Sequence, residues 1–254
     1  MSARWLNPAG GLRYHVRAWT SGSRWSAFRD SLAGWLAEFE PGTARAILVG
    51  PSAGHTLPDA FLRRFSSIIV LEPDPIAGFL LLRRLRALGV SELSLEAGDL
   101  LLSPLLGSGR GLADLLDADP DRALVFGNVL GQTSFLLGDG DFERFKAAFR
   151  ERIAPRLEGR AWLSFHDRLS GDLAPRFSGL YRAPRRLDDA AVLRELYPPA
   201  PAHGSCELFD HRSDGFFPSD RPHAYFSWPI DRRRFHLVEA VASSAVGALS
   251  RARE

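Results

Sequence analysis

Acidic, amide and imidazole side chains follow the ends of successive short apolar runs in this sequence. Uninterrupted apolar runs of this kind are typical of buried parallel strands, and parallel sheets bind ligands at the carboxyl ends of their strands. We therefore expect these polar side chains to line one ligand site, where they can accept hydrogen bonds or take up a proton. They are Glu72, Asp74, Asp99, Asn128 and His166.

The three acids of this set suit a nucleoside. Glu72 ends the second apolar run, where its carboxylate can accept hydrogen bonds from both ribose hydroxyls, and charge-assisted bonds are about twice as strong as neutral ones. Asp74 is the neighbouring candidate, although it is also placed to cap a helix that begins at Pro75. Asp99 can accept a hydrogen bond from an adenine amino group. A single acid is as readily a helix cap as a cofactor contact. Acids that follow successive strands indicate a cofactor site.

Asn128 and His166 are the candidates for catalysis. Asn128 follows the fourth apolar run, where its amide can contact a bound ligand or orient an amine. His166 follows the fifth run and can act as a general base, because the unperturbed pKa of histidine is near neutrality. A hydrogen-bonded structural histidine is an equally good interpretation of His166.

The first apolar run ends in the glycine-containing segment 50–55, Gly-Pro-Ser-Ala-Gly-His. Gly50 and Gly54 permit a tight turn and a close approach of the backbone to a ligand. A dinucleotide loop needs the pattern G-x-G-x-x-G, and a P-loop ends in Gly-Lys-Ser/Thr; this segment has neither. His55 either contacts a cofactor carboxylate or caps the turn.

Alternating strands and helices must position these residues, and their order predicts an α/β fold with a mostly parallel sheet. Strands are predicted at 46–49, 68–71, 93–95, 123–126 and 161–165. Helices are predicted at 23–39, 57–65, 75–88, 111–116 and over a segment carrying 142–153. Thr56 is a candidate cap for the second of these helices, and Asp139 or Asp141 for the last.

The C-terminal third is less regular. We expect a helix at 187–196 and antiparallel strands at 207–209 and 224–228 that extend the sheet, while 237–249 is either a strand that runs into a helix or a helix throughout. We predict a single domain over 1–254. It comprises an N-terminal helical segment at 1–43, a cofactor-binding core at 44–168, and sheet completion with substrate-binding segments at 169–254.

Four motifs in the core resemble those of the class I S-adenosylmethionine-dependent methyltransferases. The stretch 47–54, Ile-Leu-Val-Gly-Pro-Ser-Ala-Gly, is similar to their first motif, with Pro51 and Ser52 where a third glycine is common. The stretch 69–75 is similar to the second, and Ala-Gly-Asp at 97–99 to the adenine-contacting segment. The stretch 125–131 lies where the fourth is found, beside the methyl donor.

This resemblance, which covers about half of the chain, implies a Rossmann-like fold and S-adenosylmethionine as cofactor. It implies that the cofactor is held by Gly50, Ser52, Gly54, His55, Glu72, Asp74, Asp99 and Asn128. The predicted reaction is methyl transfer to a nitrogen or oxygen of a small molecule or peptide. The alternatives are an NAD(P)-dependent Rossmann oxidoreductase, a catalytically inert methyltransferase-like partner protein, and an RNA methyltransferase.

The composition is that of an ordinary globular protein. The 254 residues are 45% hydrophobic and 24% charged, with a formal net charge of +2, which argues against nucleic acid as a partner. No apolar run is long enough to span a membrane, and a lone cysteine, Cys206, suits the reducing cytoplasm. The oligomeric state stays open, a homodimer included. We predict no metal site, because the spacing of His203, Cys206, His211, His223 and His236 matches no metal-ligand pattern.

Overall fold

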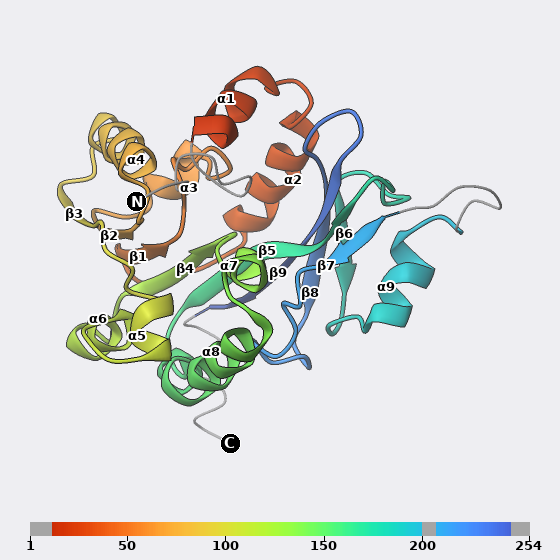
Figure 1. The fold of residues 1–254 in the computed structure, drawn as a ribbon. Coiled ribbons are helices and arrows are strands. Elements are labelled where there is room, and N and C mark those ends of the chain that lie inside the picture. The colour runs from red at the N-terminus through yellow and green to blue at the C-terminus, as the bar shows by residue number, and fades with distance from the viewer. Residues whose placement is uncertain (1–11, 200–206, 245–254) are drawn as a thin grey trace.

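One nine-stranded sheet organises the protein in a computed structural model, which describes residues 12–199 and 207–244 (Figure 1). The strand order is β3-β2-β1-β4-β5-β9-β8-β6, and β7 pairs with β5 beside this path. The first five strands are parallel to one another. They are β1 (Arg45–Val49), β2 (Ser67–Leu71), β3 (Glu92–Glu96), β4 (Ala123–Gly127) and β5 (Trp162–Gly171).

The last four strands extend the sheet with antiparallel pairs. The hairpin of β8 and β9 joins the edge of β5, β6 pairs with β8, and β7 pairs with the C-terminal end of β5. Their bounds are β6 (Leu180–Ala183), β7 (Leu208–Asp210), β8 (His223–Pro229) and β9 (Phe235–Ser243). The expected α/β class, a mainly parallel sheet with antiparallel C-terminal additions, is therefore confirmed.

Helices cover both faces of the sheet, and each face has its own apolar core. One core contains side chains of α2 (Ser26–Ala37), α3 (Asp59–Leu62) and α4 (Pro75–Ala87). The other contains side chains of α5 (Leu102–Leu106), α6 (Leu112–Ala118) and α8 (Asp139–Arg152), and the two groups lie on opposite sides of the sheet in Figure 1. The remaining helical segments are α1 (Leu12–Thr20), η2 (Leu130–Gln132), α7 (Thr133–Leu136), η3 (Ala154–Leu157) and α9 (Asp189–Leu196).

Two helix predictions were wrong in detail, and one helix was missed. The helix expected at 57–65 is reduced to the four residues of α3, and its N-cap is Pro58 rather than Thr56. The N-cap of α8 is Gly138, so Asp139 and Asp141 both lie inside the first turn and neither is the cap. Helix α1 was not predicted.

Two strand predictions differed more. Strand β5 continues to Gly171, well beyond the predicted end at residue 165, because β9 and β7 supply hydrogen-bond partners for its polar second half. Residues 235–243 form a strand, so the alternative of a helix throughout 237–249 was wrong; the rest of that segment lies mostly outside the described residues. Strand β6 was not predicted.

Candidate functional site

The carboxyl ends of β1 and β4 form the point where the strand order reverses. From β1 the chain builds outward through β2 and β3 on one side, then returns to add β4 and β5 on the other. Such a switch point leaves a crevice at the strand ends, which is where open α/β sheets bind ligands. The loop 50–58 after β1, the end of β2 and the segment after β4 all meet here.

The glycine loop after β1 depends on left-handed backbone conformations. Gly50, Ser52 and Gly54 have φ angles of 60°, 51° and 70°. A Cβ atom on Gly50 would lie 2.4 Å from the Cβ of Val129, in the segment that follows β4. Glycine is therefore required at position 50 by both its backbone angle and its close neighbour, and the loop is pressed against the end of β4.

Glu72 is held rigidly at the end of β2. Its Oε2 accepts a hydrogen bond from the backbone N–H of Ser52 at 2.8 Å, and its Oε1 accepts one from the N–H of Asp74 at 3.0 Å. Burial raises the pKa of Glu72 to about 7, although these two hydrogen bonds act in the opposite direction. Each carboxylate oxygen retains accepting capacity, so Glu72 both fixes the glycine loop and can bind a diol.

Asp74 caps helix α4, which is one of the two roles that the sequence predicted for it. Its Oδ1 accepts hydrogen bonds from the backbone N–H groups of Ile76 and Ala77, at 2.9 and 3.2 Å, in the first turn of α4. Its Oδ2 lies 3.7 Å from Nε2 of His15 in α1. A direct cofactor contact by Asp74 stays a prediction.

His55 lies beneath α1 rather than open to solvent. Its Nε2 is 3.2 Å from Nδ1 of His15, and its ring centre is 5.9 Å from Tyr14 and 6.3 Å from Trp19. Burial, together with neighbouring positive charge, lowers the pKa of His55 to about 4, so the side chain is neutral at pH 7. Helix α1 therefore covers the loop after β1, and a contact of His55 with a cofactor carboxylate would be made by an uncharged imidazole.

Asp99 uses its carboxylate locally. Its Oδ1 accepts from the N–H groups of Leu101 and Leu102, and its Oδ2 accepts from the N–H and the hydroxyl of Ser103. A carboxylate has about four lone-pair sites, and the first turn of α5 fills them. The predicted bond to an adenine amino group would have to compete with these contacts.

We therefore expect Asp99→Ala to change the stability of the protein more than its affinity for a cofactor. Loss of the local hydrogen bonds should lower the free energy of unfolding by about 1 kcal/mol, with little change in the affinity for S-adenosylmethionine. Urea denaturation and calorimetric titration of the same variant measure the two quantities. A stable variant with weakened binding would instead support the adenine contact.

Asn128 connects β4 to β5 at the switch point. Its backbone is left-handed, with a φ of 63°. Its Nδ2 donates to Oδ2 of Asp167 at 3.1 Å, and its Oδ1 accepts from the backbone N–H of Asp167 at 2.8 Å. The Asn128 side chain is thus fixed at the switch point, beside a buried carboxylate.

The structure does not bring His166 to Asn128. Neighbouring residues of a strand point to opposite faces, and it is Asp167 that faces Asn128. His166 is 2% exposed, its Nδ1 lies 2.9 Å from the hydroxyl of Ser164, and its ring stacks on Phe217 at 6.0 Å. Burial lowers the pKa of His166 to about 4. This geometry favours the structural interpretation over that of a general base.

Asp167, His211 and His236 form a polar cluster that sequence reasoning missed. One ligand atom from each lies within 4.8 Å of the others, and Oδ1 of Asp167 is 2.9 Å from Nδ1 of His236. Burial by itself would raise the pKa of Asp167, but the charges of His236 and His211 and the hydrogen bond from Asn128 lower it to about 2. The position of Asp167 after the fifth apolar run was the one local signal for this cluster.

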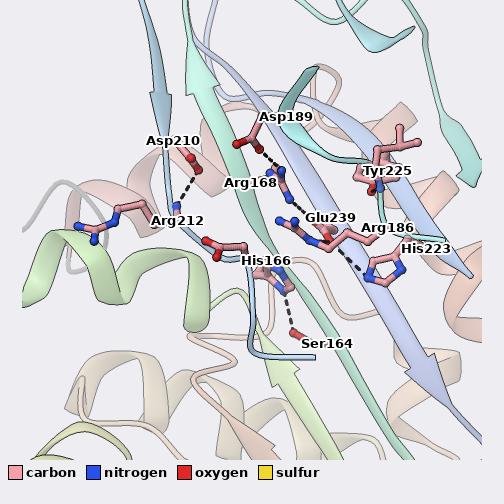
Figure 2. A network of polar contacts seen from close by, with 12 residues as sticks. Ser164, His166, Arg168, Arg186, Asp189, Asp210, Arg212, His223, Tyr225 and Glu239 are labelled. Atoms are coloured by element: carbon pink, nitrogen blue, oxygen red, sulfur yellow. Dashed lines mark hydrogen bonds and ion pairs between the residues drawn. The ribbon is translucent and has the colours of Figure 1, made fainter. Parts of the chain in front are cut away.

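A second polar network joins β5, β9 and β8 on the face that carries His166 (Figure 2). Glu239 accepts hydrogen bonds from Arg168 and Arg186, each at 2.9 Å, and its Oε1 lies 3.3 Å from Nε2 of His223. Arg168 also pairs with Asp189 at the start of α9. Glu239 and Arg168 are each 1% exposed, so this network holds the antiparallel strands to the parallel core.

The chain resembles S-adenosylmethionine-dependent methyltransferases of known structure. It is similar to CalS10, an amino pentose methyltransferase from Micromonospora echinaspora solved with S-adenosylmethionine bound, at 17% identity over 90% of this chain and 96% of that chain, with a TM-score of 0.41. It is also similar to the mitomycin 7-O-methyltransferase MmcR, at 17% identity over 55% of this chain and 36% of that chain, with a TM-score of 0.36.

A further similarity is to an O-methyltransferase family 2 protein from Planctomyces limnophilus in complex with apigenin. The identity is 18% over 61% of this chain and 42% of that chain, with a TM-score of 0.37. The chain thus spans less than half the length of this protein and of MmcR. No protein-family model and no curated protein matches the sequence.

None of the helices in residues 12–199 and 207–244 combines the length and the apolar character that a membrane crossing needs.

Proposed function

We propose that this protein is an S-adenosylmethionine-dependent methyltransferase that acts on a nitrogen or oxygen atom of a small molecule or peptide. The observation that carries the proposal is Glu72, a carboxylate fixed between Ser52 and Asp74 at the end of β2. Its free lone pairs suit the two hydroxyls of a ribose. Glu72 also lies beside the glycine loop. The glycines of this loop allow its backbone to approach a ligand closely at the switch point.

The helix after the glycine loop supports a cofactor without phosphate. Pyrophosphate sites use the free N–H groups and the positive end of a helix that follows the loop directly. Here α3 begins only at Asp59, has four residues, and is preceded by Pro58, which has no N–H group. Asp59 itself places a negative charge in the first turn. An NAD(P)-dependent oxidoreductase is therefore the weaker alternative.

The position of Asn128 at the switch point suits contact with the acceptor. S-adenosylmethionine, when bound, supplies an electrophilic methyl group, and the acceptor must lie in line with it and lose a proton. Hydrogen bonds to Asp167 fix the Asn128 side chain. The neighbouring residue, Val129, packs against Gly50 of the glycine loop. His236, whose Nδ1 lies 2.9 Å from Oδ1 of Asp167, replaces His166 as the candidate to take up the acceptor's proton. A protonated nitrogen or a hydroxyl is the acceptor class that needs such a group.

Calorimetric titration of the full chain with S-adenosylmethionine, S-adenosylhomocysteine and NADH separates the candidates. We expect saturable binding of the first two ligands and none of NADH. Binding of NADH alone would overturn the proposal in favour of an oxidoreductase. A protein that binds S-adenosylhomocysteine but converts no S-adenosylmethionine with fractionated metabolites or peptides would support the inert partner protein instead.

A further inference from the structure

Three neighbouring strands bring Asp167, His211 and His236 together. Asp167 lies in β5, His236 lies in β9, and His211 directly follows β7. Strands β9 and β7 both pair with β5, and the β5–β9 register shifts between Asp167 and Leu169. The N–H of His211 donates to the carbonyl of Arg168 at 3.0 Å, which fixes the third member. The cluster is therefore built on sheet backbone rather than on loose loops.

Two buried polar atoms of the cluster face each other without a hydrogen bond. Oδ1 of Asp167 and Nδ1 of His236 are 2.9 Å apart, but they are not aligned as donor and acceptor, and neither atom has another partner in the structure. Asp167 is 2% exposed, so solvent does not satisfy its oxygen. Unpaired buried polar atoms are costly, and a shared ligand would satisfy both.

We propose that Asp167, His211 and His236 bind a divalent first-row transition-metal ion. Metal–nitrogen and metal–oxygen bonds are about 2.0–2.2 Å long, so two ligand atoms 2.9 Å apart subtend about 90° at the ion, as neighbouring ligands do in an octahedral site. One atom of each of the three residues lies within 4.8 Å of the others. Two ligand atoms of one ion can be at most about 4.4 Å apart, so binding requires the third atom to move inward by a few tenths of an ångström.

The surrounding contacts orient the ligands in the manner of metal sites, where outer hydrogen bonds fix each ligand's position. Nδ1 of His211 contacts the carbonyl of Gly131, which only accepts hydrogen bonds, so this nitrogen carries the proton. Nε2 of His211 is therefore unprotonated, and its lone pair accepts a hydrogen bond from the hydroxyl of Ser170 at 2.9 Å. Ion binding requires that this hydroxyl turn away. Oδ2 of Asp167 is held by Asn128, which leaves Oδ1 for the ion.

The donor set selects the kind of ion. Two imidazoles and one carboxylate suit zinc, iron, manganese and cobalt, whereas magnesium and calcium prefer oxygen ligands throughout. Three protein ligands leave coordination positions open. Metal binding does not depend on the proposed methyl transfer. If both hold, the charge of the ion would favour proton loss from a bound acceptor, in place of His236 as base.

Titration of the chelator-treated full chain with cobalt(II), without S-adenosylmethionine, tests the site by visible absorption and by calorimetry. We expect one ion per chain and the weak absorption of nitrogen and oxygen ligands. The variants His236→Gln, His211→Gln and Asp167→Asn should each weaken binding by at least about ten-fold. Ser170→Ala should keep or increase the affinity, because it removes the competing hydroxyl.

His223→Gln is the matched control. His223 is also a buried histidine beside a carboxylate, because its Nε2 lies 3.3 Å from Glu239. The carboxylate of Glu239, however, already pairs with Arg168 and Arg186. This variant should bind cobalt as the unsubstituted chain does. Thermal melting verifies that each variant is folded. Absence of binding by the folded unsubstituted chain, unchanged affinity in the ligand variants, or a strong thiolate charge-transfer band would each overturn the proposal.

Discussion

Replacement of Glu239 by alanine is expected to lower the free energy of unfolding by about 3–5 kcal/mol. Glu239 is the common partner of Arg168 and Arg186, and it lies 3.3 Å from His223 in the network of Figure 2. Arg168 is 1% exposed, so the substitution would leave a buried guanidinium with only Asp189 as its charged partner. A buried charge that loses its buried partner costs far more than a broken surface pair.

Urea denaturation at neutral pH measures this effect, and Glu38→Ala is its matched control. Glu38 also pairs with an arginine, Arg182, but the two side chains are 59% and 52% exposed. Exposed pairs contribute little, so the control should unfold close to the unsubstituted chain. Equal midpoints for Glu239→Ala and Glu38→Ala would show that the buried network does not stabilise the sheet.

The affinity for S-adenosylmethionine is expected to be about ten-fold higher at pH 8 than at pH 6. The pKa of Glu72 is raised to about 7 in the protein without cofactor, chiefly by burial. Below this pH the carboxyl is protonated and has lost accepting capacity for the ribose hydroxyls. Above it the carboxylate accepts from both. Affinity must therefore rise with pH through about 7, and binding below this pH must release a proton.

Calorimetric titration with S-adenosylmethionine across this pH range tests the second prediction. Glu72→Gln should bind weakly and remove the part of the pH dependence that belongs to this carboxyl. Glu96→Gln, at the end of the neighbouring strand β3, is the control and should keep the full dependence. If Glu72→Gln binds as tightly as the unsubstituted chain at pH 8, the ribose assignment is wrong.

The parallel half of the fold was predictable because its signals are local. The runs at 46–49 and 68–71 are apolar without interruption, and such strands are buried on both faces. The observed strands β1 and β2 extend these runs by a single residue each. Asp74 before Pro75 likewise predicted the observed start of α4, because a cap and a first-turn proline act within one turn.

Partner strands decided the elements that were missed. The second half of β5 is polar in sequence and reads as a loop, yet β9 and β7 hydrogen-bond to it from both sides. Helix α3 was predicted too long: it begins only after Pro58 and ends at Leu62, three residues before the predicted end. Strand propensity is weak next to such tertiary contacts.

The sequence by itself determined where the glycine loop and Glu72 lie. The glycine loop and Glu72 each follow a strand directly, so their positions at the sheet edge are a consequence of strand and turn residues close by in the chain. Only the tertiary structure decided which residue of the pair His166 and Asp167 faces Asn128, because side chains alternate between the two faces of a strand. It also decided the cluster with His211 and His236. Contacts between residues so far apart in the chain depend on strand order and register, which no local pattern encodes.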